Sequence, residues 1–164
     1  MSSVSSSPSR RKRQLGADIR ASLREATNQV TLLGHHVGDS LDIRDVDFEC
    51  LDLIGQHGPL TPSVLARLAG LHPATVTGIL DRLENGGWVV RERDPADRRA
   101  VLVRAVRERS AQILGLYAGM NNSMAEIISG YDERQLETIA DFLARTAEAG
   151  RRAIDDIAAT KKSR

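Results

Sequence analysis

The chain has 164 residues, a formal net charge of +1 at pH 7 and a single cysteine. This length suits one folded domain with its own hydrophobic core, and one cysteine excludes an intrachain disulfide framework and fits a reducing compartment. No apolar run approaches the roughly 18 residues of a membrane helix, and the N-terminus lacks the apolar segment of a secretory signal. We therefore expect a cytoplasmic protein without membrane contacts.

The N-terminal residues are Ser-rich and then basic, through Arg10-Arg11-Lys12-Arg13. Such a composition does not order itself, so residues 1–13 are expected to form a disordered tail. The tail is either simply solvated or a basic arm that adds phosphate contacts. Apolar residues then recur at helical spacing from Leu15 to Val37, which predicts a long amphipathic helix over residues 14–40.

Three shorter helices are predicted next. Asp42 can cap a helix that runs to about His57, and this helix is apolar on more than one side, as a central buried helix would be. Thr61, followed by proline, starts a short helix that ends at Gly70. The next helix starts at Pro73, and the short gap between the two is typical of a helix-turn-helix.

The helix from Pro73 to Asn85 has one apolar side, which comprises Val76, Ile79, Leu80 and Leu83. Its outward residues near the N-terminus are small, so the backbone could approach base edges, and threonine could contact bases or phosphates. Arg82 is positioned to hold a phosphate. An ordinary solvent-facing helix would show the same periodicity. The predicted base-contacting residues are Ala74, Thr75, Thr77 and Gly78.

Two β-type runs, Trp88–Arg93 and Ala100–Val106, flank the charged turn Asp94-Pro95-Ala96-Asp97-Arg98-Arg99. Proline presets φ and aspartate side chains bond nearby amides, which predicts a hairpin with Arg98 and Arg99 near its tip. An arginine there could enter a narrow minor groove, where the negative potential is enhanced. Asp97 could hold the Arg99 guanidinium, or the two could form a surface ion pair of little weight.

Charge is distributed unevenly along the chain. Arginines outnumber acidic residues from Arg91 to Arg107, and acidic residues dominate from Asp42 to Asp52. A nearly neutral protein can still bind phosphate at a basic pole, because screening keeps the remote acidic face from opposing it. A helix pair followed by an arginine-tipped hairpin is the plan of a winged helix-turn-helix.

The C-terminal third carries two further helical patterns. Apolar residues from Ile113 to Ile128 predict a fifth helix, which Gly130-Tyr131 breaks. Asp132 with Gln135 forms a capping-box signature for a sixth, whose apolar stripe is interrupted near Gly150. One subunit cannot cover such long stripes, so residues 107–160 are predicted to be dimerisation helices. The alternative is that they fold back onto the same subunit.

The stretch from Leu60 to Val106 resembles the DNA-binding region of the MarR family of bacterial transcriptional regulators. The resemblance is carried by Thr75-Val76-Thr77, Asp81-Arg82-Leu83-Glu84, Gly87-Trp88-Val89 and the Asp97-Arg98-Arg99 wing. It implies an obligate homodimer built by the first and the last two helices, pseudo-palindromic operators, and an Arg99 that enters the minor groove beside Asp97. One departure is His72 at the N-cap of the recognition helix, because histidine is not a preferred cap.

The resemblance also implies a ligand crevice between the dimerisation helices and the DNA-binding lobe. The residues expected to face it are His35, His36, Val37, Phe48 and Leu51. Cys50, which lies in an apolar stretch beside Glu49, is predicted to be a core residue rather than a redox sensor. Adjacent histidines on a helix diverge by about 100° and do not chelate one metal by themselves.

The predicted fold is mainly α with a small β-hairpin: a winged helix-turn-helix, residues 41–106, flanked by long N- and C-terminal dimerisation helices. The spacings of catalytic triads, phosphate loops and metal sites are missing from the sequence, so we predict no enzyme, cofactor or metal. The predicted function is a homodimeric, sequence-specific DNA-binding regulator, a repressor responsive to a small-molecule effector. The alternative is a winged-helix module for protein–protein interaction or a scaffold.

Overall fold

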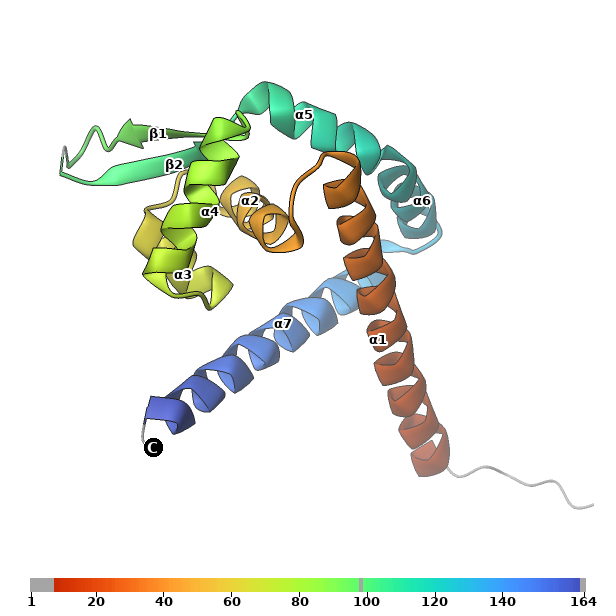
Figure 1. Ribbon diagram of the computed structural model, residues 1–164. Helices are drawn as coiled ribbons and strands as arrows, with labels where there is room; N and C mark the ends of the chain where they lie inside the picture. Colours follow the sequence, from red (N-terminus) through yellow and green to blue (C-terminus); the bar gives the residue numbers. More distant parts are fainter. Residues whose placement is uncertain (1–7, 98, 163–164) are drawn as a thin grey trace, which may run out of the picture. The chain divides into compact units, whose positions relative to one another are not determined.

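The computed structural model describes residues 8–97 and 99–162 and divides into two compact units, residues 1–116 and 117–164 (Figure 1). The fold is mainly helical with one two-stranded hairpin, as predicted. The first unit contains α1 (Pro8–Ser40), α2 (Asp45–His57), α3 (Pro62–Ala69), α4 (Pro73–Asn85), β1 (Val89–Arg93), β2 (Val101–Ala105) and α5 (Arg107–Leu116). The second contains α6 (Ala118–Ser129) and α7 (Glu133–Lys162).

Helix α1 starts earlier than its predicted boundary at residue 14. It begins at Pro8, so residues 8–13 are helical and do not belong to a disordered tail. Proline fits the first turn of a helix, and the arginines and lysine that follow are good helix formers. Residues 1–7 lie outside the described part of the chain.

The turn between α1 and α2 corrects a second expectation. Asp42 does not cap α2: it has φ 54°, in the left-handed region, and its amide donates to the Asp39 carbonyl at 3.2 Å. The N-cap is Arg44, whose side chain makes no capping hydrogen bond. Acidic residues in the first turn of α2, Asp45 and Asp47, stabilise this end through the helix dipole instead.

The core of the first unit forms where α2, α3 and α4 pack with the hairpin. Helix α2 is central, as predicted, with buried residues on several sides, among them Phe48, Cys50 and Ile54. The predicted inner face of α4 is confirmed. The buried apolar residues are Val37, Ile43, Phe48, Cys50, Leu51, Ile54, Leu60, Leu65, Ala66, Val76, Ile79, Leu80, Leu83, Trp88, Val89 and Val103.

The short connection between α3 and α4 follows from its end signals. The Thr61 hydroxyl accepts from the Val64 amide at 3.3 Å and caps α3, with Pro62 at the first helical position. Gly70 ends α3 at φ 65°, a left-handed conformation that favours glycine. The chain then re-enters a helix at Pro73, which gives the predicted helix-turn-helix.

The hairpin pairs Val89 with Ala105 and Arg93 with Val101 in antiparallel register. Leu60 joins it through a further bridge, in which the Leu60 amide donates to the Val103 carbonyl at 3.0 Å and the reverse bond is 2.7 Å. This bridge ties the segment before α3 to the base of the wing. The loop between the strands therefore extends from a fixed base (Figure 1).

The second unit contains two helices with exposed apolar residues. The Asp132 capping box is confirmed: Asp132 Oδ1 accepts from the Gln135 backbone amide, and the Gln135 side-chain oxygen Oε1 accepts from the Asp132 backbone amide, both at 2.9 Å. Helix α7 continues through Gly150, where an interruption was expected. The fifth predicted helix is two helices, α5 and α6, separated at Tyr117. None of the described helices combines the length and apolar character needed to cross a bilayer.

Candidate nucleic-acid interface

The start of α4 presents small side chains to solvent. Ala74, Thr75 and Thr77 are exposed and Gly78 is half-buried, whereas the apolar residues of the opposite face are buried. The Thr77 hydroxyl donates to the Pro73 carbonyl at 3.2 Å, so its hydrogen is used within the helix and its oxygen remains as an acceptor. A helix surface of this kind brings its backbone close to whatever it contacts.

His72 caps α4. Its Nδ1 accepts a hydrogen bond from the Ala74 amide at 3.3 Å, with Pro73 at the first helical position. The N-cap position of His72 is as predicted, but its side-chain bond was not expected, because histidine is not a preferred N-cap residue. The proline that follows His72 was the available signal, since proline is over-represented at the first position of a helix.

Arg82, which was predicted to hold a phosphate, forms a bidentate salt bridge with Asp47 of α2. Its Nε lies 2.7 Å from Asp47 Oδ2 and its Nη2 lies 2.6 Å from Asp47 Oδ1. The Asp47 side chain is only 5% exposed and that of Arg82 is 41% exposed. The hydrogen bond with Asp47 raises the pKa of the Arg82 guanidinium. The pair fixes α4 against α2, and sequence reasoning missed Asp47.

A second arginine ties the wing to the same helix. Arg91 of β1 donates through Nη1 to Glu84 and through Nη2 to Asp81, each at 2.7 Å. Both acids are on α4. Arg82 therefore ties α4 to α2, and Arg91 ties α4 to β1. Of these groups, the sequence pattern singles out only the run from Asp81 to Glu84.

Aspartates shape the wing loop as predicted. Asp94 Oδ1 accepts from the Ala96 amide at 2.8 Å, and the Asp94 amide donates to the Ala100 carbonyl at 3.0 Å. Asp97 Oδ1 accepts from the Arg99 amide at 3.0 Å. These bonds close the loop locally and do not involve its basic side chains.

Asp97 was expected to hold the Arg99 guanidinium, and the structure corrects this. The Asp97 carboxylate bonds the Arg99 backbone amide, because an amide two residues on is within easy reach of an aspartate side chain. Within residues 8–97 and 99–162, the exposed Arg99 side chain has no ion pair. Arg98 lies outside the described residues.

The wing is anchored to α5 at Trp88. The indole is buried, and the Arg109 guanidinium carbon lies 4.7 Å from its ring centroid, a cation–π contact. The Val106 amide donates to the Trp88 carbonyl at 2.9 Å. The base of the wing and the start of α5 are thus held together.

The residues expected to face a ligand crevice divide into two groups. Phe48 and Leu51 line a cavity of about 260 Å³. His35, His36 and Val37 are not among its lining residues: Val37 is buried, His36 is exposed, and His35 Nδ1 lies 2.9 Å from Asp45 Oδ1. The other residues around the cavity are Asp52, Gly55, Gln56, Ala105, Ser110, Ile113 and Leu114.

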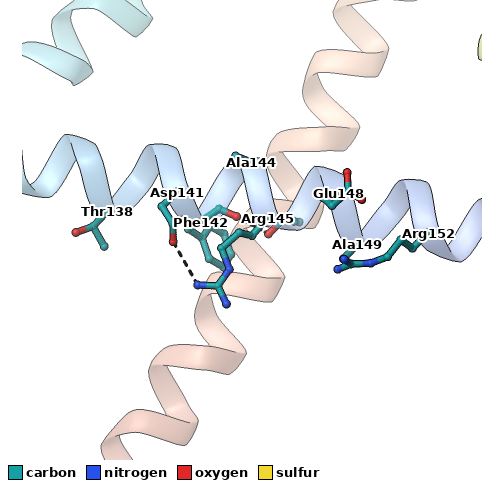
Figure 2. A pocket seen from close by; sticks show the side chains of 9 residues that line it. Thr138, Asp141, Phe142, Ala144, Arg145, Glu148, Ala149 and Arg152 are labelled. Atoms are coloured by element: carbon teal, nitrogen blue, oxygen red, sulfur yellow. Dashed lines mark hydrogen bonds and ion pairs between the residues drawn. The ribbon is translucent and has the colours of Figure 1, made fainter.

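A larger hollow, about 1010 Å³, lies along α7 in the second unit (Figure 2). All the residues that line it belong to that one helix, from Thr138 to Arg152. Arg145 spans one turn to Asp141 at 3.3 Å, and the half-exposed Phe142 ring lies beside this pair. One side of a single helix does not enclose a ligand, so this hollow is an open helix surface.

A helix-turn-helix with an arginine-bearing wing defines the class of winged-helix DNA-binding proteins. Residues 43–101 match the family model for the MarR family. The uncharacterised HTH-type transcriptional regulator YcgE of Bacillus subtilis is 32% identical over 119 residues, which cover 72% of this chain and 77% of that protein. The organic hydroperoxide resistance transcriptional regulator of the same organism is 30% identical over 132 residues, 77% of this chain and 84% of that protein.

The crystal structure of the transcriptional regulator Tm0710 from Thermotoga maritima is also similar. It has 29% sequence identity and a TM-score of 0.60, and the match covers 85% of this chain and 98% of that one. The chain therefore belongs to the MarR family of transcriptional regulators. It is a regulator and not an enzyme, as predicted.

Proposed function

We propose that this protein is a homodimeric, sequence-specific repressor whose affinity for a pseudo-palindromic operator responds to a small molecule. The observation that carries the proposal is the surface of α4. Small exposed residues begin that helix, Arg82 and Arg91 lock it in place, and Arg99 is exposed on the wing beside it.

In this proposal α4 lies in the major groove. Ala74, Thr75, Thr77 and Gly78 lie against base edges, where their small size permits close approach of the backbone and threonine can contact a thymine methyl. Arg82 chiefly orients α4, because Asp47 already engages its Nε and Nη2. Its Nη1 makes neither of those bonds and is the atom that we assign to a phosphate.

The wing supplies the minor-groove contact. Arg99 is the main candidate, with Arg98 as the second, because a guanidinium is drawn to the enhanced negative potential of a narrow minor groove. Asp97 contributes by shaping the loop that presents Arg99, through its bond to the Arg99 amide. Arg99→Ala is expected to weaken operator binding strongly without unfolding the protein.

The apolar surfaces of α1, α6 and α7 support a homodimer. Isolated hydrophobic residues on a surface are ordinary, but extended apolar faces mark interaction sites. A two-fold pair would bury these faces and place the two copies of α4 about 34–36 Å apart, one DNA turn. The exposed apolar residues are Leu15, Ile19, Val30, Leu32, Met120, Met124, Ile127, Ile128, Ile139, Phe142, Leu143, Ile154 and Ile157.

The signal is proposed to be a bound molecule rather than oxidation of a thiol. One relative regulates organic hydroperoxide resistance, and peroxides react with exposed thiolates of low pKa. Cys50, the one cysteine of this chain, is fully buried, and burial raises the pKa of its thiol to about 11. This thiol stays protonated and inaccessible at neutral pH.

Fluorescence anisotropy against duplex DNA from upstream of the protein's own gene tests the proposal. Binding that survives excess competitor DNA and weakens steeply with salt is expected of a specific, phosphate-anchored regulator. Arg99→Ala is compared with Arg145→Ala, which removes the same charge from α7. Equal affinity of the two variants contradicts the wing contact, and no DNA binding at low salt favours a winged-helix module for protein contacts.

A further inference from the structure

We propose that the cavity between α2 and α5 binds a small cationic ligand, which has one apolar ring and a short arm that ends in an ammonium group. This inference rests on the proposed response to a small molecule and names the chemical class of that molecule. It is carried by the lining of the cavity, which combines an apolar wall with hydrogen-bond acceptors and no arginine or lysine.

The apolar wall comes from three elements. Phe48 and Leu51 belong to α2, Ala105 lies at the end of β2, and Ile113 and Leu114 belong to α5. At about 260 Å³, the cavity is slightly below the range of about 300–1,000 Å³ that is usual for small-molecule sites. An occupant with one ring therefore suits it.

The polar groups of the lining are disposed to accept hydrogen bonds. Asp52 Oδ2 accepts from Gln56 Nε2 at 2.6 Å. The Ser110 hydroxyl donates its hydrogen to the Val106 carbonyl at 3.1 Å, which leaves the hydroxyl oxygen as an acceptor. A ligand that meets Asp52 and Ser110 must bring N–H or O–H donors, and an ammonium group brings three N–H donors together with a positive charge that complements Asp52.

The charge at the cavity is negative and uncompensated among the described residues. Two other acids of α2 already have partners, since Asp45 pairs with His35 and Asp47 with Arg82. Asp52 has no ion pair in the described part of the chain. The nearby Arg109 of α5 is engaged elsewhere, over the Trp88 ring and with Gln112 at 3.2 Å.

A cation bound here would contact two elements that are linked to α4 and to the wing. The cavity walls belong to α2, which holds α4 through Asp47, and to α5, which follows the wing directly. None of the described residues of α5 is buried. A ring bound in the cavity would therefore add apolar contacts between α5 and α2. Binding at this site would thus affect the orientation of α4, the helix that we propose to contact DNA, through α2.

Three probes of one shape and different charge test the site: benzylamine, benzyl alcohol and benzoate. They are titrated into the full-length protein at neutral pH by calorimetry, with amide shifts of Ala105 and Ser110 followed by NMR. Benzylamine is expected to bind about tenfold more tightly than benzyl alcohol, as a charge-assisted hydrogen bond provides. Benzoate is expected not to bind.

Two variants and one control variant locate the interaction. Asp52→Asn is expected to weaken benzylamine about tenfold and leave benzyl alcohol unchanged, while Glu49→Gln, the same charge change on the same helix but outside the cavity lining, should alter neither. Leu114→Trp fills the cavity from an exposed position and is expected to abolish binding of both probes.

Equal binding of benzoate and benzylamine, an unaffected Asp52→Asn, or no binding of any probe at millimolar concentration would each overturn the proposal. DNA binding is measured separately, without probe. A protein that binds benzylamine as expected but fails to bind DNA contradicts the proposed function and leaves the cation site standing, and the reverse result removes only the site.

Discussion

At the scale of single residues, the pair of Arg82 and Asp47 has two unequal members. Asp47 is buried and Arg82 reaches solvent, so the loss of folding stability depends on which of the two side chains is removed. Loss of the arginine leaves a carboxylate without a partner in the protein interior, and loss of the aspartate leaves a guanidinium that water can solvate.

Arg82→Ala is therefore expected to lower the free energy of unfolding, because the Asp47 carboxylate stays buried and unpaired. Asp47→Asn is expected to cost clearly less. Urea denaturation without DNA measures both, with Arg145→Ala as a surface control. Equal losses in the two variants would show that burial of Asp47 does not dominate the pair.

His35 gives a pH dependence whose sign follows from its partner. The hydrogen bond with Asp45 raises the pKa of His35 above 6.5, with further electrostatic contributions from Asp45, Glu49 and Asp39 that outweigh desolvation. Because the folded pKa is raised, the protonated pair stabilises the fold fully below pH 6.5, and this contribution is lost as the pH rises through the folded pKa.

His35→Gln is expected to be less stable than the wild type at about pH 5.5 and nearly equal to it at about pH 8.5. The urea midpoint at the two pH values is the measurement, and His36→Gln serves as the control at the neighbouring exposed position. A constant difference between His35→Gln and the wild type across this range contradicts the role of protonation.

At the scale of elements, α4 carries a glycine that helix stability alone does not favour. A Cβ at Gly78 would lie 3.6 Å from Arg82 Nη1, an ordinary contact, so alanine fits there. Glycine inside a helix costs about 0.5–1 kcal/mol relative to alanine. Its presence on the outward face fits a close approach of the helix to DNA.

Gly78→Ala is expected to stabilise the protein by up to about 1 kcal/mol, and Gly78→Leu to abolish specific DNA binding while the fold remains intact. Gly55→Ala, within α2 where nothing lies near the added Cβ, should bring a similar gain without any effect on DNA. Thermal unfolding and operator anisotropy provide the two readings. Specific binding by Gly78→Leu at wild-type affinity removes Gly78 from the interface.

The elements that the sequence predicts well are those with local signals. Thr61, Gly70 and the Asp132 capping box mark their helix ends through bonds to residues a few positions away. The wing follows from aspartates that bond amides two residues on. Periodicity identifies the inner face of α4 because a helix repeats its faces regularly.

The features that escape prediction depend on distant partners or on competing preferences. The bond from Arg82 to Asp47 spans 35 positions, and Arg91 reaches back to α4 from the following strand. Gly150 weakens a helix without ending it, since neighbouring residues of high helix propensity carry α7 past it. The Asp97 carboxylate could accept from the Arg99 amide or from its guanidinium, and the conformation of the folded loop determines that the amide lies within reach.

At the scale of the whole molecule, a long helix with an exposed apolar side requires a partner. Helix α7 has 30 residues, and Ile154 and Ile157 are 66% and 61% exposed. An isolated helix gains little stability from propensity and depends on packing of its apolar face. A second copy of the chain is the partner that we propose, because a two-fold axis lets one apolar face cover its equivalent.

Ile154→Asp with Ile157→Asp is therefore expected to convert the proposed dimer to a monomer of 17.9 kDa. Burying an isoleucine side chain contributes about 1.5–3 kcal/mol, and two-fold symmetry counts each substitution twice, so the dimer should weaken at least about a hundredfold. Sedimentation equilibrium at micromolar concentration measures the mass, and Arg152→Asp places the same acid on the opposite side of the helix. A monomeric wild type, or a double variant that remains dimeric, would show that α7 does not form the interface. If the double variant loses both dimerisation and operator affinity while Arg152→Asp retains both, DNA recognition depends on the pairing of two chains.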